Sequence, residues 1–527
     1  MTIAESIYKL RTKAKLSQEK LADILGVSRQ AVQKWEAGTA QPDIGKIINL
    51  ARYFNISLDD LLLDSNIRIK EEFGGHKKIL PSYEKLPVWE SYPEELETEY
   101  RQSMEEGLDV EKYKDLFLAV AKMERDRNKN KIGDVIFDIV LNAPARKDYK
   151  YNEPSDLEGI RALREKHEFE AKKPDKTQLK DKICGAWLGR VCGCMLGKTV
   201  EGIRTDELVP LLKESGNYPM HRYILSTDPT AEMLEKFRFP LSKANYIDKC
   251  DGMPADDDTN YTVMANLLIE RYGRDFTPEN VAELWLASQP SYAYCTAERV
   301  AFNNFASGYY PPDSAVYKNP YREWIGAQIR ADYFGYINPG DPETAAEMAW
   351  RDASISHIKN GIYGEMFAAA MIACAAETDN IRDIILGGLG EIPATSRLYE
   401  QIKYIIEFYD SKKSCEACFD DIHSRYDEFN SHDWCHTISN AEIVVAALLY
   451  GEGDYGKSIG LAVQTGFDTD CNGATVGSIL GMRGGTRCID KAWSEPINDK
   501  LDTAIFGVGK VHISEMAKKT MKHIETK

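Results

Sequence analysis

The sequence lacks both a long apolar run and the features of an export signal. Its longest apolar stretches, such as residues 366–376, are far shorter than the ~20 residues of a membrane-spanning helix. Near the start, Glu5, Lys9 and Arg11 interrupt the apolar segment that a signal peptide would need. We therefore expect a soluble, cytoplasmic protein with no membrane partner.

The sequence also lacks the cysteine pattern of a disulfide framework. It contains 11 cysteines, an odd number, and Cys192, Cys194 and Cys374 lie within apolar helical patterns. This is typical of buried free thiols in a reducing compartment. Cys415 and Cys418 form a lone C-x-x-C. Because no second pair follows at zinc-finger spacing, we interpret it as incidental.

Basic charge is scarce outside the first part of the chain. The whole chain has 66 Lys and Arg against 83 Asp and Glu, a net charge of −17. Residues 1–64 carry 9 basic and 8 acidic side chains, a net of +1, which leaves −18 for residues 65–527. A region with this much negative charge repels the phosphates of nucleic acids. Contact with DNA is therefore predicted only for the first 64 residues.

Length and periodicity predict an all-α protein of several domains. A chain of 527 residues is too long to fold around a single hydrophobic core. Its content of 43% hydrophobic residues is enough to form several packed domains. Apolar positions recur at helical spacing throughout. We expect a small helical domain at 1–64, a Gly- and Pro-containing linker at 65–88, a helical extension at 89–176 and a large helical domain at 177–527.

The first domain has the pattern of a helix-turn-helix. Residues 4–63 predict five short helices, with Ser17 and Ser28 as N-caps and Gly26 at the turn between two of them. Residues 16–62 read LSQEKLADILGVSRQAVQKWEAGTAQPDIGKIINLARYFNISLDDLL. This stretch resembles the lambda-repressor/Cro-like family, also called XRE.

The resemblance implies sequence-specific DNA binding. Gln18 would meet a phosphate at the start of the second helix. The outward face of the third helix would meet the major groove with Arg29, Gln30, Gln33 and Lys34. Gln and Arg suit adenine and guanine edges, respectively. The small net charge predicts modest affinity for one copy, so we expect a homodimer on two half-sites. The alternative is a small helical domain with a solvated polar face.

Two helices of the large domain carry stripes of glycine. The first has Gly185, Gly189, Gly193 and Gly197, and the second has Gly473, Gly477 and Gly481. Each glycine costs about 1 kcal/mol of helix propensity, so close backbone packing is expected to compensate. The segment CGCMLGKT is not a phosphate loop, because Cys192 stands at the first glycine position and no strand precedes it.

Clustered carboxylates precede two helices of this domain. Asp256, Asp257 and Asp258 come directly before one helix, and Asp468 and Asp470 come before the second glycine-striped helix. One or two carboxylates are enough to interact favourably with the dipole at a helix N-terminus. A third carboxylate adds repulsion between like charges, which a bound cation would reduce. Oxygen-only ligands favour Mg²⁺ or Mn²⁺, and two clusters favour a two-ion site. Taken singly, each cluster is better explained as a solvated helix cap, but the shared architecture of the two clusters favours the metal site.

These segments resemble the ADP-ribosylglycohydrolase family. Its members are all-helical enzymes that release ADP-ribose from modified acceptors with two Mg²⁺ or Mn²⁺ ions. The matching segments are DKICGAWLGRVCGCMLGKTVEG, ADDDTNYTVMANLLIE and GFDTDCNGATVGSILGMRGG. The resemblance implies that Glu201 is the catalytic glutamate. It makes Asp257 and Asp258 the paired aspartates of the first metal motif, and Asp468 and Asp470 the D-T-D of the second.

At other positions the resemblance gives a less specific role, or the residue differs from the one that the family usually has. The segment SISHIKNGIYG places His357 near the ribose, although a lone buried histidine is as readily structural. Asp256 stands where many members have Thr, and Cys471 where Thr usually follows the D-T-D. Asn472 is a candidate replacement ligand. Because both departures touch the metal ligands, they leave the substrate class open.

The resemblance implies that the ions, held by the five aspartates, bind the ribose hydroxyls and activate water, with Glu201 as general acid/base. We expect a hydrolase fused to a DNA-binding regulator, acting on an ADP-ribosylated protein, nucleic acid or small molecule. The main alternative is a sensor that binds ADP-ribose or a similar ligand without turnover. The presence of Glu201 favours catalysis. A third hypothesis is hydrolysis of another riboside.

Overall fold

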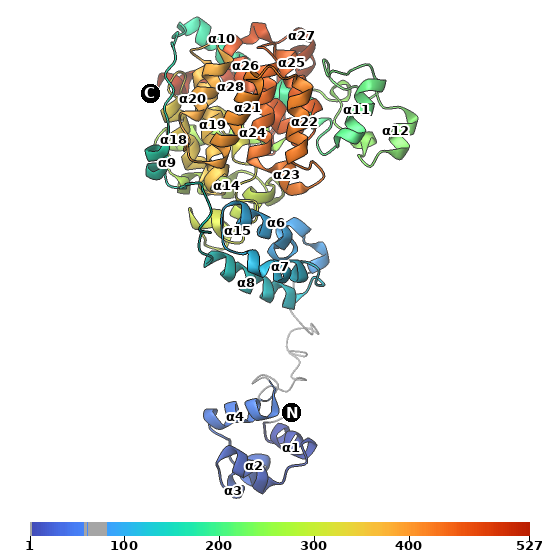
Figure 1. The fold of residues 1–527 in the computed structure, drawn as a ribbon, viewed down its shortest axis with the longest axis vertical. Helices are drawn as coiled ribbons and strands as arrows, with labels where there is room; N and C mark the ends of the chain where they lie inside the picture. Colours follow the sequence, from blue (N-terminus) through green and yellow to red (C-terminus); the bar gives the residue numbers. More distant parts are fainter. Residues whose placement is uncertain (1–2, 57–60, 62–81, 527) are drawn as a thin grey trace. The chain divides into compact units, whose positions relative to one another are not determined.

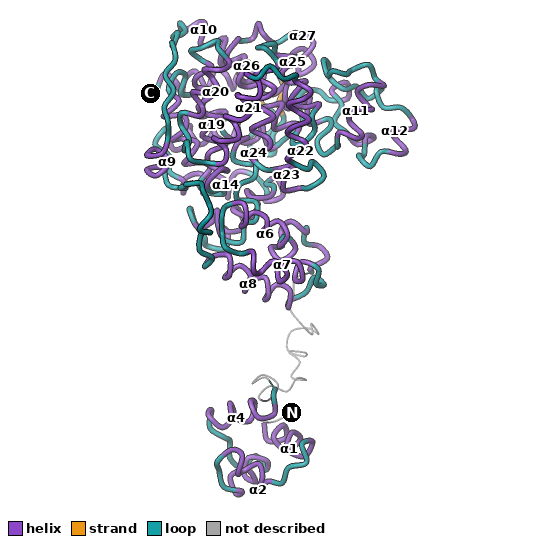
Figure 2. Tube along the Cα trace, viewed as in Figure 1, coloured by secondary structure: helices purple, strands orange, loops and turns teal. Residues whose placement is uncertain are grey.

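The computed structural model describes residues 3–56, 61 and 82–526. The chain forms two compact units, Met1–Lys85 and Leu86–Lys527. Helices and loops make up nearly the whole trace (Figure 2), and the described strands β1 (Lys500–Leu501) and β2 (Val511–His512) form one antiparallel pair. The predicted all-α class is confirmed. No described helix is long and apolar enough to cross a membrane.

The first unit contains the predicted helix-turn-helix. Its described helices are α1 (Ile3–Lys13), α2 (Gln18–Leu25), α3 (Arg29–Glu36) and α4 (Ile44–Phe54). Ser17 accepts a hydrogen bond from the N–H of Lys20 and caps α2, and Ser28 accepts one from Ala31 and caps α3. Gly26, at φ 62°, ends α2. The predicted fifth helix lies, apart from Leu61, on residues outside the described part.

The predicted extension belongs to the same compact unit as the large domain. Residues 65–81 of the predicted linker lie outside the described part, and the unit boundary follows Lys85. The helices of the extension are α6 (Leu96–Glu105), α7 (Lys114–Ala121), α8 (Arg127–Leu141) and α9 (Leu157–Leu163), with short 3-10 helices at Val88–Glu90, Tyr92–Glu94 and Glu111–Tyr113. One more 3-10 helix, Tyr83–Lys85, lies in the predicted linker at the end of the first unit.

The large domain gathers its helices into one bundle, from which α11 and α12 project to one side (Figure 1). Its α-helices are α10 (Lys176–Lys198), α11 (Thr205–Glu214), α12 (Ala231–Lys236), α13 (Asp257–Tyr272), α14 (Pro278–Ser288), α15 (Thr296–Ala306), α16 (Asp313–Val316), α17 (Asp332–Tyr336), α18 (Pro342–Ala353), α19 (Lys359–Ala375), α20 (Ile381–Leu389), α21 (Arg397–Asp410), α22 (Cys415–Arg425), α23 (Ser431–Cys435), α24 (Thr437–Tyr450), α25 (Tyr455–Gln464), α26 (Thr469–Gly484), α27 (Lys491–Ser494) and α28 (Ile513–Glu525). Short 3-10 helices span Leu241–Lys243, Ile247–Lys249, Ser291–Ala293, Gln328–Arg330, Thr486–Cys488 and Glu495–Ile497.

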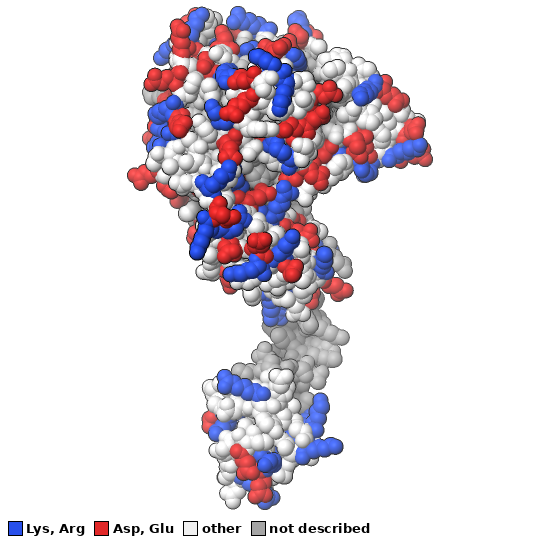
Figure 3. All heavy atoms as spheres, in the orientation of Figure 1, with Lys and Arg blue, Asp and Glu red and all other residues white. Residues whose placement is uncertain are grey.

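The longest apolar run of the sequence lies at the centre of this bundle. Every residue from Met366 to Ala376, in and just after α19, is at most 1% exposed. A helix that is apolar all round is buried on all sides, here by other helices of the domain. Outside the core, the face seen in Figure 3 carries acidic and basic side chains interspersed.

The two glycine-striped helices, α10 and α26, pack backbone against backbone. A Cβ added at Gly189 would lie 2.2 Å from the carbonyl oxygen of Gly477, and one added at Gly193 would lie 2.0 Å from that of Gly473. Both distances are far below van der Waals contact, so no side chain fits along this seam. The close approach predicted from the glycine spacing is confirmed. It brings the loops at the ends of α10 and α26 together.

Candidate active site

The acidic clusters predicted from the sequence meet at the N-termini of α13 and α26. Asp256 is the N-cap of α13, and Asp257 and Asp258 lie in its first turn. Asp468 is the N-cap of α26, and Asp470 lies in its first turn. Ligand oxygens from Asp256, Asp257, Asp258 and Asp470 all lie within 4.8 Å of one another. The fold therefore brings together carboxylates from segments that are far apart in the sequence.

Two of these carboxylates have an oxygen without any partner. Asp258 Oδ2 and Asp470 Oδ1 are buried and have no hydrogen-bond partner within the described part of the chain. The other oxygen of Asp258 accepts a hydrogen bond from Arg190 Nη2 (3.1 Å). Burial raises the pKa of Asp258 and Asp470 well above the usual range, and nearby carboxylates add to this effect. Unpartnered buried carboxylate oxygens are costly, so these residues fit a hard divalent cation such as Mg²⁺ or Mn²⁺.

Asp256 differs from its neighbours because both of its oxygens are engaged. Oδ1 accepts hydrogen bonds from the backbone N–H of Asp258 (3.0 Å) and the thiol of Cys194 (3.3 Å). Oδ2 accepts one from Lys198 Nζ (2.7 Å). Asp256 therefore lies in the cluster with its charge already paired.

Glu201 lies in the turn that follows α10 and faces the same cavity as Asp257, Asp468 and Asp470. Although Glu201 is exposed to solvent, the protein around its carboxyl desolvates it and raises its pKa to about 7. Repulsion from Asp256 adds to this effect, and Lys198 opposes it. A carboxyl in this state can donate or accept a proton near neutral pH.

A cavity of about 410 Å³ opens in front of these carboxylates. Its lining is aromatic as well as acidic, and Arg204 lies over the ring of Trp434 at 4.8 Å. The lining residues are Trp89, Glu95, Glu201, Arg204, Asp257, Cys295, Thr296, Glu298, Tyr321, Trp324, Ile325, Gly326, Ile329, Ser431, Trp434, Cys435, Asp468, Asp470 and Cys471. Trp89 and Glu95 come from the extension, for which the sequence suggested no chemistry.

Helix α6 of the extension holds two segments that line this cavity. Arg101 pairs with Asp433, and Gln102 Nε2 donates to Glu323 Oε2 (2.6 Å). The first contact fixes the segment that carries Trp434 and Cys435. The second fixes the segment that carries Tyr321 and Trp324. The extension is therefore part of the cavity wall.

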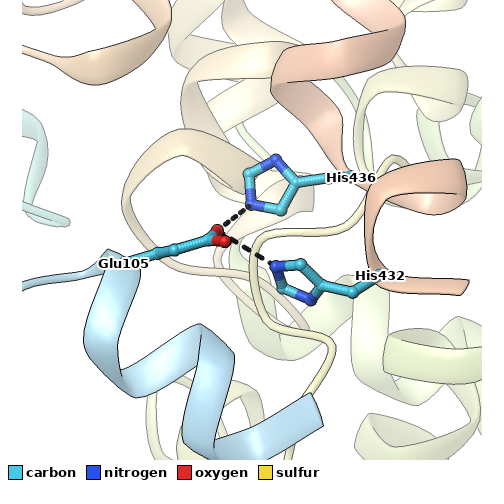
Figure 4. A group of neighbouring side chains, drawn as sticks. All are labelled: Glu105, His432 and His436. Carbon is cyan, nitrogen blue, oxygen red and sulfur yellow. Dashed lines mark hydrogen bonds and ion pairs between the residues drawn. The ribbon is translucent and has the colours of Figure 1, made fainter. Parts of the chain in front are cut away.

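A carboxylate–histidine group joins α6 to the same segments (Figure 4). Glu105 Oε2 lies 3.0 Å from His432 Nε2 and 3.8 Å from His436 Nε2. Trp324 Nε1–H donates to Nδ1 of His432, and the backbone N–H of Ile438 donates to Nδ1 of His436. Because both partners can only donate, each neutral imidazole carries its proton on Nε2, toward the carboxylate. A histidine ligand instead offers a bare nitrogen to the metal, so we interpret the Glu105–His432 pair as a hydrogen-bonded clamp. His436 Nε2, 3.8 Å from Glu105, has no hydrogen-bond partner among the described residues.

The other two candidate residues of the large domain, His357 and Asn472, are not part of the cavity lining, and neither are Asp256 and Asp258. His357 is fully buried, with Nδ1 2.8 Å from Ser356 Oγ and Nε2 3.9 Å from Glu298 Oε1. Burial lowers the pKa of His357 well below its usual range. Asn472 donates from Nδ2 to Asn440 Oδ1 (2.8 Å), and its own Oδ1 has no partner. The structure places neither side chain in the lining of the cavity.

In the first unit, the predicted recognition residues share one face. Arg29, Gln30, Gln33 and Lys34 are exposed on α3, whereas Val32 and Trp35 are buried on its other side. Gln18 donates from Nε2 to Glu36 Oε2 (2.8 Å), and Glu36 also pairs with Arg11 Nε (2.5 Å). The side-chain amide of Gln18 is therefore engaged within the domain.

The fold and the site define an all-helical domain with a carboxylate-lined cavity, preceded by a helix-turn-helix domain. The family model of ADP-ribosylglycohydrolase matches residues 175–526, and the chain belongs to this family. A helix-turn-helix model matches residues 7–61. Both resemblances inferred from the sequence are confirmed.

Curated transcriptional regulators match the N-terminal part of the chain. The HTH-type transcriptional activator BcrR of Enterococcus faecalis is 39% identical over 62 residues, which are 12% of this chain and 30% of BcrR. The uncharacterized HTH-type transcriptional regulator YqaE of Bacillus subtilis is 36% identical over 78 residues, 15% of this chain and 66% of YqaE. The chain thus spans less than two thirds of the length of these regulators. A solved structure titled ADP-ribosylglycohydrolase-related protein complex aligns with a TM-score of 0.43 and 15% identity, over 66% of this chain and 99% of that one.

Proposed function

We propose that the second unit is a metal-dependent hydrolase that releases ADP-ribose, or a related ribosyl group, from an acceptor. The observation that carries this proposal is the pair of buried, unpartnered oxygens of Asp258 and Asp470 beside the cavity that Glu201 faces. Asp257, Asp258, Asp468 and Asp470 would hold two divalent cations, Mg²⁺ or Mn²⁺. When bound, the cations supply Lewis-acid stabilisation at the ribose hydroxyls.

The residues of the chain supply the remaining chemistry. Glu201 is the general acid/base, because its carboxyl faces the cavity and its pKa of about 7 permits both proton states. The carboxylates around it stabilise the positive charge that develops on a ribose ring as its glycosidic bond breaks. The rings of Trp89, Tyr321 and Trp434 offer apolar faces to a planar group such as a base.

We further propose that the first unit binds DNA sequence-specifically as a homodimer. The support is the exposed row of Arg29, Gln30, Gln33 and Lys34 on α3, together with the transcriptional regulators that match this unit. The free state of all 11 cysteines fits the reducing cytoplasm, where we expect the protein to act.

Release of ADP-ribose from arginine- and serine-linked conjugates tests the hydrolase, with Mg²⁺ or EDTA present. We expect metal-dependent release that falls by a factor of about 10²–10⁴ in Glu201→Gln. Glu214→Gln, the same change on an exposed residue of α11, serves as the control. ADP-ribose binding without release would overturn the hydrolase and support the second candidate, a ligand-sensing regulator, which the fusion to a helix-turn-helix domain favours.

A further inference from the structure

The acidic cluster includes one positively charged side chain, that of Lys198. Lys198, the last residue of α10, places Nζ 2.7 Å from Asp256 Oδ2, and its side chain is 14% exposed. Burial opposes the charged form, but Asp256, Asp470 and Glu201 together raise the pKa of Lys198. The glycine seam fixes the backbone at this end of α10, since Gly197 packs against Thr469. The position of the ammonium group is therefore set by the fold.

Asp256 and Lys198 form a matched pair within the cluster. Both oxygens of Asp256 accept hydrogen bonds from the chain, whereas Asp258 and Asp470 each keep a buried oxygen without a partner. The carboxylate of Asp256 thus adds one negative charge, and the ammonium of Lys198 cancels it. Asp258 and Asp470, each with one oxygen that has no hydrogen-bond partner among the described residues, are the carboxylates left to bind a metal cation.

We propose that Asp256 is the counter-ion of Lys198 and not a metal ligand, and that Lys198 is a resident cation that weakens the binding of divalent metal at this site. This inference rests on the proposed function, because it assumes a metal site at Asp258 and Asp470. Its physical basis is Coulombic: a fixed positive charge beside the ligands repels a divalent ion and remains when the metal leaves. The affinity for metal is therefore lower than the number of carboxylates suggests.

Mn²⁺ binding to the full chain, followed by the electron paramagnetic resonance of free Mn²⁺, tests this inference without a substrate. The decisive variant is the double change Lys198→Met with Asp256→Asn, which removes both charges and leaves the net charge unaltered. We expect it to bind Mn²⁺ within about three-fold of wild type, whereas Asp258→Asn, which removes a ligand, should lose about 100-fold or more. Lys198→Met alone should bind about ten-fold more tightly, and Lys198→Arg should match wild type.

The outcomes separate this inference from the proposed function. If wild type binds Mn²⁺ and the double variant binds as poorly as Asp258→Asn, then Asp256 is a ligand and the inference is wrong. Binding by Lys198→Met but not by wild type would support the inference and overturn the proposed metal-dependent activity. Binding by neither overturns both. Circular dichroism of every variant checks that the double change has left the helices intact.

Discussion

The close packing of the glycine stripes of α10 and α26, the glycine seam, leads to a prediction about two alanine variants. Both should lose stability, but only one should lose affinity for metal. In Gly197→Ala, the new Cβ would lie 2.2 Å from the carbonyl oxygen of Thr469 and 2.3 Å from the backbone nitrogen of Asp470. These are backbone atoms, which cannot rotate away, so α10 and the start of α26 must move apart. Forced overpacking costs about 1–3 kcal/mol, and backbone contact places this case at the upper end. The gain in helix propensity of about 1 kcal/mol leaves a net loss of about 2 kcal/mol.

Gly185→Ala is the matched control at the other end of the seam. Its Cβ would lie 2.5 Å from the carbonyl oxygen of Gly481, so the loss of stability should be similar. The two positions are 12 residues apart on one helix, about 18 Å at 1.5 Å per residue, and Gly185 lies far from the carboxylates. We expect urea unfolding to show the same destabilisation in both variants.

Mn²⁺ titration should then distinguish the two variants, because Gly197→Ala displaces the backbone of Asp470 and Gly185→Ala does not. We expect at least ten-fold weaker binding in Gly197→Ala alone, since a small displacement of one ligand costs metal affinity. Equal Mn²⁺ affinity in the two variants, or wild-type stability in both, would refute the argument that this seam builds the site.

Three further predictions concern the cavity wall, His436 and the first unit. Trp89→Ala should raise the KM for an ADP-ribosylated conjugate about ten-fold with little change in kcat, because it removes one aromatic wall; Val88→Ala, an exposed neighbour, should change neither. Burial lowers the pKa of His436 to about 3, so the unfolded chain binds the extra proton between that pH and about 6.5. The free energy of unfolding should therefore fall as pH drops through this range, and His436→Asn, which keeps a cap for α24, should reduce the slope. Arg29→Ala should weaken binding to DNA selected from a random library and relax base preference at one position, and unaltered preference would argue against α3 as the reading helix.

The sequence predicted the parts of this molecule that depend on local pattern. The four-residue spacing of Gly185 to Gly197 and of Gly473 to Gly481 predicted two closely packed helices, and the structure confirms that packing. It also indicated that Asp256 to Asp258 and Asp468 to Asp470 stand at helix N-termini. Spacing carries this information because a helix repeats every 3.6 residues wherever it lies.

Features that depend on tertiary contact were not predicted. Trp89 lies in a Pro-containing segment without periodicity, and its place in the cavity follows from how α6 docks on the large domain. The pairing of Lys198 with Asp256 joins residues 58 positions apart. The place of His357 near the ribose stays a prediction; its side chain lies buried outside the lining, 3.9 Å from Glu298 of the lining, a contact that the sequence did not indicate. A motif fixes residue types, whereas packing decides which of them face solvent.

The most direct test of the central claim is a crystal structure of the full chain grown with Mn²⁺, with data collected at the manganese absorption edge. The account predicts an anomalous peak within coordination distance of Asp258 Oδ2 and Asp470 Oδ1, two buried oxygens of the acidic cluster that have no hydrogen-bond partner among the described residues. Anomalous density at Glu105, His432 and His436 instead, or none at the N-termini of α13 and α26, would contradict it.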